Sequence, residues 1–227
     1  MSLTKDDIFV LIAAYNEERK IGRVIERVRA QGYHLHVVDD GSTDGTAAIL
    51  RQFDISHEIS VPNAGKGAAL KKGFRHFLSG PHRALIVMDA DGQHLPEELD
   101  HFLHALNATG ADVVLGNRMH DPRGMSWVRV CTNRVMSGLL SWAAGCRMPD
   151  TQCGFRALTR RAVERIRIES DRFEAESEML LEAVRHGLKI ESTAVSSVYA
   201  DEKSHIHPVR DTLRFFQFLF RALSKKR

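Results

Sequence analysis

The amino-acid sequence predicts an α/β fold with a mostly parallel central sheet and helices on both faces. Short apolar runs alternate with segments of helical periodicity as far as residue 118, and this alternation is typical of strand–helix–strand units. Several apolar runs end directly in acidic or amide residues, as expected where strands meet a ligand at one edge of a sheet. The 227 residues, 43% of them hydrophobic, suffice for a large core.

Five apolar runs are expected to form strands. They are Ile8–Ala14, His34–Asp40, Ile55–Val61, the run that begins at Leu85, and Ala111–Arg118. The segment 17–30 carries apolar residues three and four apart, which predicts a helix. Further helices are expected after the turn at 41–46, after the glycine-rich stretch "NAGKG", and from Pro96, because proline favours the first turn of a helix.

Beyond residue 120 the alternation stops. We expect a long helix at 127–144, then the segment "DTQCGFRAL", more helix, a strand near Ile190–Tyr199 and a C-terminal helix. The last segment, 208–227, combines an apolar stripe with basic residues. Such a helix either lies on an anionic membrane or docks on the domain with a basic tail, and the sequence leaves both open.

Composition excludes some classes of protein. The net charge of +3 is too small to indicate a nucleic-acid partner. The three cysteines form no CxxC pair, which favours a reducing compartment over a disulfide scaffold. No signal peptide and no apolar run long enough to span a membrane are found. We therefore expect a cytoplasmic protein, which would also contact the cytoplasmic membrane face if the helix at 208–227 binds lipid and does not dock on the domain.

Polar residues follow four of the expected strands, in "AAYNE", "DDGSTDGT", "DADGQ" and "GNR". In a parallel sheet these strand ends meet at one edge, where ligands bind. A GxGxxG fingerprint and a GxxxxGK[ST] phosphate loop are both missing from the sequence, so a dinucleotide fold and a P-loop are not indicated. Asp89, Asp91 and Gln93 alternate, and in extended backbone they would point the same way. These oxygen ligands suit Mg²⁺ or Mn²⁺, which commonly share a diphosphate.

The motifs "AAYNEE", "VVDDGSTDGT", "NAGKG", "MDADGQH", "GNR", "DTQCGFRAL" and "FEAESEML" occur in the order seen in family 2 glycosyltransferases. The chain most resembles the branch that transfers mannose or glucose to dolichol or polyprenyl phosphate. The resemblance implies a GT-A fold, a GDP- or UDP-sugar donor, a divalent metal and inverting transfer of a hexose. It also implies one catalytic unit at 1–207, with a donor half at about 1–118 and an acceptor half at about 119–207.

The resemblance assigns roles to individual residues. The expected donor-binding residues are Ala14, Tyr15, Glu17, Asp40, Lys66, Asp89, Ala90, Asp91 and Gln93, of which Asp89, Asp91 and Gln93 are also the expected metal ligands. The expected acceptor-binding residues are Arg118, Arg129, Asn133, Ser204 and Arg210. The segment around Asp150, Gly154, Phe155 and Arg156 matches one that shapes the sugar pocket.

The expected catalytic residues are Asp91, Arg118 and Glu178. A phosphate acceptor arrives largely ionised and needs no strong base, whereas a hydroxyl acceptor needs one, for which Glu178 is the candidate. Two alternatives stay open at this point: a transferase with a hydroxyl acceptor, such as a saccharide or another lipid, and a non-catalytic subunit that binds a nucleotide sugar.

Overall fold

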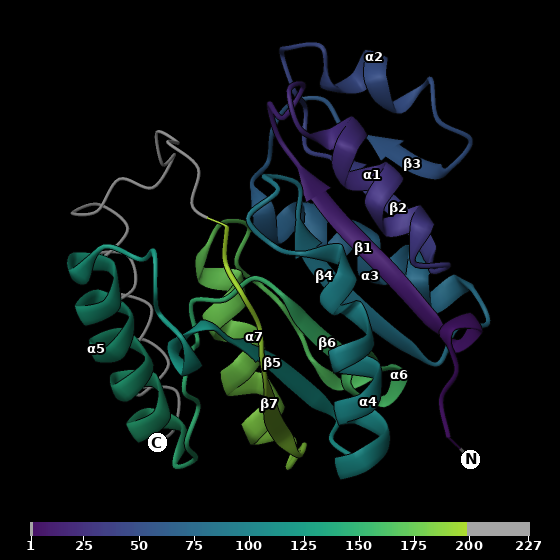
Figure 1. The fold of residues 1–227 in the computed structure, drawn as a ribbon. Helices are drawn as coiled ribbons and strands as arrows, with labels where there is room; N and C mark the ends of the chain where they lie inside the picture. The colour runs from purple at the N-terminus through teal and green to yellow at the C-terminus, as the bar shows by residue number, and fades with distance from the viewer. Residues whose placement is uncertain (1, 199–227) are drawn as a thin grey trace.

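The computed structural model describes residues 2–198, which form one sheet with helices on both of its faces (Figure 1). The strands are β1 (Ile8–Ala14), β2 (His34–Asp39), β3 (Ser56–Ile59), β4 (Ala84–Asp89), β5 (Val113–Asn117), β6 (Arg156–Thr159) and β7 (Ile190–Ala194). The helices are α1 (Ile21–Ala30), α2 (Thr46–Leu50), α3 (Lys66–Ser79), α4 (Leu99–Thr109), α5 (Trp127–Ala144), α6 (Arg160–Arg165) and α7 (Glu174–Arg185). Short 3-10 turns lie at Lys5–Asp7, Pro96–Glu98 and Arg118–His120.

The seven strands lie in the order β3-β2-β1-β4-β6-β5-β7. Strand β1 pairs in parallel with β2 and with β4, and β2 pairs in parallel with β3. Strands β5 and β7 also pair in parallel. Strand β6 runs antiparallel to both of its neighbours, β4 and β5. The mostly parallel sheet with helices on both faces is therefore confirmed, and the carboxyl ends of β1, β2, β4 and β5 lie at one edge.

Strand β6 is a correction to the sequence analysis, which expected no strand between the long helix and the next helical segment. It has four residues and begins with the buried Arg156. A run this short, with a charged residue at its start, gives no apolar pattern that distinguishes it from a loop. Its strand conformation depends on pairing with β4 and β5, which are distant in the sequence.

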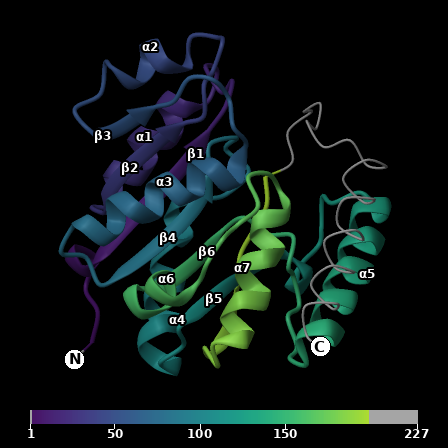
Figure 2. The same cartoon turned by 180° about the vertical axis from the view of Figure 1, so that it is seen from behind.

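Two layers of core side chains sandwich the sheet. One contains Val10 and Ile12 of β1 and packs under α1 and α4. The other contains Phe9 and Leu11 of the same strand and packs under α3, α6 and α7, which Figure 2 shows from behind. Because both faces are covered, β1 is apolar along its whole length instead of alternating.

Helix α5 has the bounds that the sequence predicts. The Ser126 side chain accepts a hydrogen bond from the backbone N–H of Arg129 at its start, and Gly145 ends it with φ 75°. The helix lies at the side of the molecule, and its inner residues, such as Leu140, join the core beside α7 (Figure 1). Asn133 and Ser137 are also buried on this inner side.

The expected C-terminal strand ends earlier than the sequence suggested, at Ala194. The segment 208–227 lies outside the described residues. The division into a donor half and an acceptor half stays a prediction. Within residues 2–198, none of the helices has both the length and the apolar character needed to cross a membrane.

Candidate active site

The candidate site lies at the edge where β1, β2, β4 and β5 end. The loops after β1 and β2 are held together by side-chain hydrogen bonds to backbone groups. Asn16 Oδ1 accepts from the N–H of Thr43 at 2.8 Å, and Thr46 Oγ1 accepts from the N–H of Glu17 at 2.8 Å. Much of the "DDGSTDGT" motif is therefore turn chemistry that fixes the shape of this edge.

Lys66 joins three elements of the site. It is the first residue of α3, and its Nζ lies 2.5 Å from Asp89 Oδ1 at the end of β4 and 2.7 Å from Glu176 Oε1 in the first turn of α7. The lysine side chain is only 14% exposed. Burial by itself would lower the pKa of Lys66, but the two carboxylates outweigh burial and raise it above its usual value. The ammonium therefore stays charged throughout the physiological pH range.

Asp89 is enclosed by its neighbours. Its Oδ2 lies 3.4 Å from Nε2 of the buried His94. Burial opposes ionisation, yet the charge of Lys66 lowers the pKa of Asp89 well below its usual value. A Cβ atom on Gly154 would lie 2.5 Å from Asp89 Oδ2, so only glycine leaves room for the carboxylate there.

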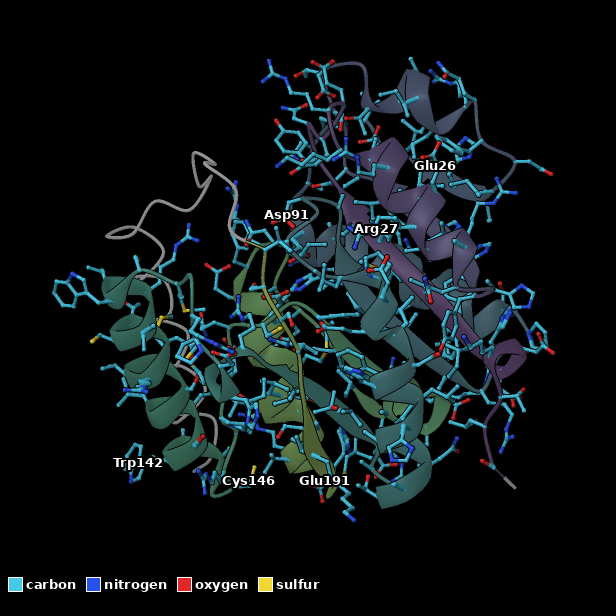
Figure 3. The ribbon with its side chains drawn as sticks, in the orientation of Figure 1. Glu26, Arg27, Asp91, Trp142, Cys146 and Glu191 are labelled. Atoms are coloured by element: carbon cyan, nitrogen blue, oxygen red, sulfur yellow. The ribbon has the colours of Figure 1, made fainter. Side chains whose placement is uncertain are left out.

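Asp91 lies beyond the end of β4. The expectation that residues 89, 91 and 93 share an extended backbone was therefore wrong. Strand β4 ends at Asp89 and the chain turns, with Gly92 at φ 71°. The alternation of residues 89, 91 and 93 therefore does not follow an extended backbone. Instead, Asp91 Oδ1 accepts a hydrogen bond from the Gln93 N–H at 2.9 Å. Burial, followed by the nearby Asp89, raises the pKa of Asp91. Figure 3 labels Asp91 at this edge of the sheet.

The residues present fit a divalent cation only in part. No group of three or more His, Cys, Asp or Glu side chains within residues 2–198 is arranged to hold a metal ion. Asp89 and Asp91 supply carboxylate oxygens, which Mg²⁺ and Mn²⁺ prefer, but Asp89 already contacts Lys66. A cation here would complete its coordination with oxygens from a bound diphosphate and with water, as Mg²⁺ commonly does.

Arg118 and Asn133 are both tied to Asp150, which is fully buried. Arg118 donates from Nε and Nη2 to the two carboxylate oxygens at 2.8 and 3.0 Å, and Asn133 donates from Nδ2 at 2.6 Å. Burial works against ionisation, but these hydrogen bonds and the arginine charge lower the pKa of Asp150. Two of the expected acceptor residues are thus held in place by one buried anion, at the junction of β5 and α5.

The "GFR" part of the segment also has a structural role. Phe155 is buried with its ring centroid 4.4 Å from that of Phe102 and 5.0 Å from that of His94. The buried Arg156 guanidinium donates to the backbone carbonyls of Thr151, Cys153 and Glu176. Arg156 therefore fixes the loop before β6 against the start of α7, where Glu176 meets Lys66.

The expected donor residues surround the ends of β1 and β2. Ala14 is buried and Tyr15 is 43% exposed. Glu17 Oε2 lies 3.8 Å from Lys20 Nζ. Asp40 is used within the protein, since its carboxylate accepts hydrogen bonds from Asn63 Nδ2 and from the backbone of residues 64 and 65. Burial raises the pKa of Asp40, and the two backbone hydrogen bonds partly offset that rise.

Glu178 lies two residues beyond Glu176 on α7. Its Oε2 accepts hydrogen bonds from the backbone N–H groups of Glu169 and Ser170, at 3.1 and 2.8 Å. Glu178 therefore holds the loop before α7 in place. Glu176 is the residue of α7 that contacts Lys66, on which Asp89 also converges. Arg129 is exposed in the first turn of α5. Ser204 and Arg210 lie outside the described residues.

Sequence reasoning missed three features of this site. It gave no role to His94, and it included Glu176 in the motif "FEAESEML" without expecting the contact with Lys66. It also placed Asp40 in the donor pocket without weighing Asp39. Asp39 is fully buried, its Oδ1 accepts from Ser42, and no partner among residues 2–198 hydrogen-bonds its Oδ2. The adjacent acids Asp39 and Asp40 indicated a polar site after β2. A sequence does not show, however, which of the two side chains is used within the protein.

Comparison with known proteins identifies the class of protein. The family model described as glycosyl transferase family 2 matches residues 9–167, and the chain belongs to this family. An uncharacterized protein of Methanocaldococcus jannaschii is 30% identical over 99% of this chain and 94% of its own length. A UDP-N-acetylglucosamine–dolichyl-phosphate N-acetylglucosaminyltransferase of Methanococcus voltae is 26% identical over 86% of each chain. The polyprenol monophosphomannose synthase of Mycolicibacterium smegmatis is 34% identical over 69% of this chain and 63% of its own length.

Solved structures agree on the fold. The glucosyl-3-phosphoglycerate synthase of Mycobacterium tuberculosis, in complex with Mn²⁺, UDP-glucose and phosphoglyceric acid, superimposes with a TM-score of 0.71. The match covers 96% of this chain and 79% of that one, at 19% identity. The protein is therefore a glycosyltransferase with a GT-A-like fold, as its motifs predicted.

Asp150→Asn should lower the free energy of unfolding by about 3 kcal/mol, because it leaves Arg118 without its buried counter-charge. Asp121→Asn is the matched control. Asp121 also pairs with an arginine, Arg123, but at the surface, so its loss should leave the denaturation midpoint unchanged. Urea denaturation followed by circular dichroism measures both.

The same variant tests the pKa of Asp150. Because its folded-state pKa lies below the unfolded value of about 3.9, its contribution is complete above that pH. The contribution is lost as the pH falls through the folded-state pKa. In Asp150→Asn the free energy of unfolding should therefore decrease less steeply at acid pH than in the wild type. An equally steep decrease in both proteins would contradict the buried ion pair.

Proposed function

We propose that the protein transfers a hexose from a nucleotide-diphosphate sugar to a polyprenyl phosphate, with the help of Mg²⁺ or Mn²⁺. The observation that carries this proposal is the Lys66–Asp89–Glu176 cluster beside Asp91, at the edge of the sheet where ligands of such folds bind. Family membership supports sugar transfer, and the relatives named for polyprenol and dolichyl phosphates support the acceptor class.

The donor would lie along the ends of β1, β2 and β4. The buried Oδ2 of Asp39 can accept a hydrogen bond from a nucleobase N–H, which would satisfy an atom that otherwise lacks a partner within residues 2–198. Tyr15 directly follows Ala14, the register partner of Asp39, and its side chain is 43% exposed. The identity of the base and the sugar is left open by this proposal, because the relatives carry different sugars in their names.

The diphosphate gains negative charge as it leaves. Lys66 is a buried, permanently charged ammonium next to the carboxylates, so it can bind the diphosphate and stabilise that charge. Asp89 and Asp91, with Gln93 as a further oxygen donor, would hold the metal. When bound, the metal would supply additional positive charge at the diphosphate oxygens.

The acceptor phosphate would be positioned from the α5 side. Arg118, Arg129 and Asn133 are the candidates, and two of them are already oriented by Asp150. A phosphate oxygen forms the new bond to the anomeric carbon as the bond between that carbon and the diphosphate breaks. No proton has to be removed from an ionised phosphate, so the transfer needs no general base.

Asp91→Asn should abolish transfer, because a neutral amide is a poor ligand for a hard cation. We expect a decrease of several orders of magnitude in a protein that still folds. The thermal stabilisation by Mn²⁺ with a nucleoside diphosphate should disappear as well. Asp54→Asn, which changes an exposed carboxylate between α2 and β3, is the control and should behave as wild type. Normal Mn²⁺-dependent turnover in Asp91→Asn would refute the metal assignment.

Glu176→Gln and Glu178→Gln form a matched pair on one helix. Glu176→Gln removes one of the two carboxylates that hold Lys66, so transfer should fall strongly. Among the described residues, Glu178→Gln alters only the hydrogen bonds from the backbone of residues 169 and 170, so most of the activity should remain. The measurement is sugar transfer to polyprenyl phosphate across pH. A loss beyond about a thousandfold in Glu178→Gln, with folding and donor binding intact, would instead indicate a general base and a hydroxyl acceptor.

A further inference from the structure

The outer side of α5 carries a continuous apolar face. Its members are Trp127, Val128, Cys131, Val135 and Trp142, and all five are exposed. At 100° per residue they fall within an arc of about 100° on the helix surface. The two tryptophans are 77% and 73% exposed, and Figure 3 shows Trp142 pointing away from the sheet. Exposed aromatic residues grouped in this way indicate an interaction surface.

The charged residues of α5 and of the loop residues next to it have one sign. From Gly124 to Pro149 the chain carries three arginines, Arg129, Arg134 and Arg147, and no aspartate or glutamate. All three arginines are exposed. Arg134 lies on the helix surface directly beside the apolar arc, whereas the helix as a whole is unable to cross a membrane. An exposed apolar face on a helix whose charged residues are all arginines is complementary to an anionic, apolar-cored surface.

We propose that the outer face of α5 docks on an anionic lipid membrane, with Trp127 and Trp142 inserted at the level of the headgroups. Tryptophan prefers this interface because its ring is apolar and its N–H is polar. The two rings lie 15 residues apart, or about 22 Å along the helix, so the helix would lie flat on the membrane.

This docking explains how a lipid acceptor reaches the site, and in that respect it rests on the proposed function. The inner side of the same helix carries Asn133, which is tied to Asp150 and through it to Arg118. A membrane against the outer side therefore lies one helix diameter from the expected acceptor residues. The face is distinct from 208–227, the segment for which the sequence left membrane contact open.

The chain provides its own probe, because Trp127 and Trp142 are its two tryptophans. In the full chain without lipid, iodide should quench their fluorescence. Vesicles of phosphatidylcholine with 30% phosphatidylglycerol should shift the emission to the blue and protect it from iodide. Brominated acyl chains should quench it. Emission that stays unchanged while the protein floats with the vesicles would overturn the proposal, because a different surface would then be bound.

Variants separate this face from others. Trp127→Ser/Trp142→Ser should weaken flotation with anionic vesicles about tenfold or more, because two large apolar side chains no longer insert. Val135→Ser should weaken it as well, whereas Val61→Ser, at a valine that is 88% exposed between β3 and α3, should not. High salt and pure phosphatidylcholine should both weaken binding. Equal binding by Val135→Ser and Val61→Ser would contradict the assignment.

Two further outcomes have distinct meanings. If iodide fails to quench the free protein, another part of the chain or a second copy covers the face and the proposal is wrong. The proposal is also wrong if the double variant turns a dimer into a monomer without affecting vesicle binding.

Activity distinguishes this failure from failure of the proposed function. The double variant should keep turnover with a short, water-soluble prenyl phosphate and lose it with acceptor in vesicles. If neither protein uses any prenyl phosphate but vesicle binding follows the face, only the proposed function fails.

Discussion

The ammonium group of Lys66 holds together the elements that form the candidate active site. It contacts Asp89 at the end of β4 and Glu176 at the start of α7, while Lys66 itself begins α3. Without a cation at this point, two carboxylates would face each other in a largely buried space, which is strongly unfavourable. The rest of the site depends on this arrangement. Gly154 leaves room for Asp89, and Arg156 holds the loop before β6 against α7.

A second buried charge, Asp150, does the same for the other half of the site. It orients Arg118 from the end of β5 and Asn133 from α5, so the inner side of α5 is fixed to the sheet by hydrogen bonds. The outer side of that helix is left apolar and cationic. One helix thus links the expected acceptor residues with the surface that we propose to meet the membrane.

The sequence predicts most of the fold because strands β1, β2, β4 and β5 are almost entirely buried. Continuous apolar runs such as Ile8–Ala14 are recognisable without any structure, and so are the turn residues that follow them. Strand β6 escaped prediction because its conformation comes from partners distant in the chain. The contacts of Asp40 and Glu178 escaped for a related reason, since neighbouring acids look alike in a sequence and only tertiary packing decides which of them faces the site. The direction of Asp91 was missed because a turn at Gly92 interrupts the extended backbone.

The most direct test of this account is a double-mutant cycle between Lys66→Met and Asp89→Asn, measured as the free energy of unfolding. The control is a second cycle, between Lys71→Met and Asp171→Asn. Lys71 also lies on α3, Asp171 lies in the segment before α7, and this ion pair is more exposed. If Lys66 is the cation on which the site depends, the first cycle should show a favourable coupling of about 1–3 kcal/mol, while the exposed pair should be close to additive. Additivity within about 0.5 kcal/mol in both cycles would contradict the central role of Lys66.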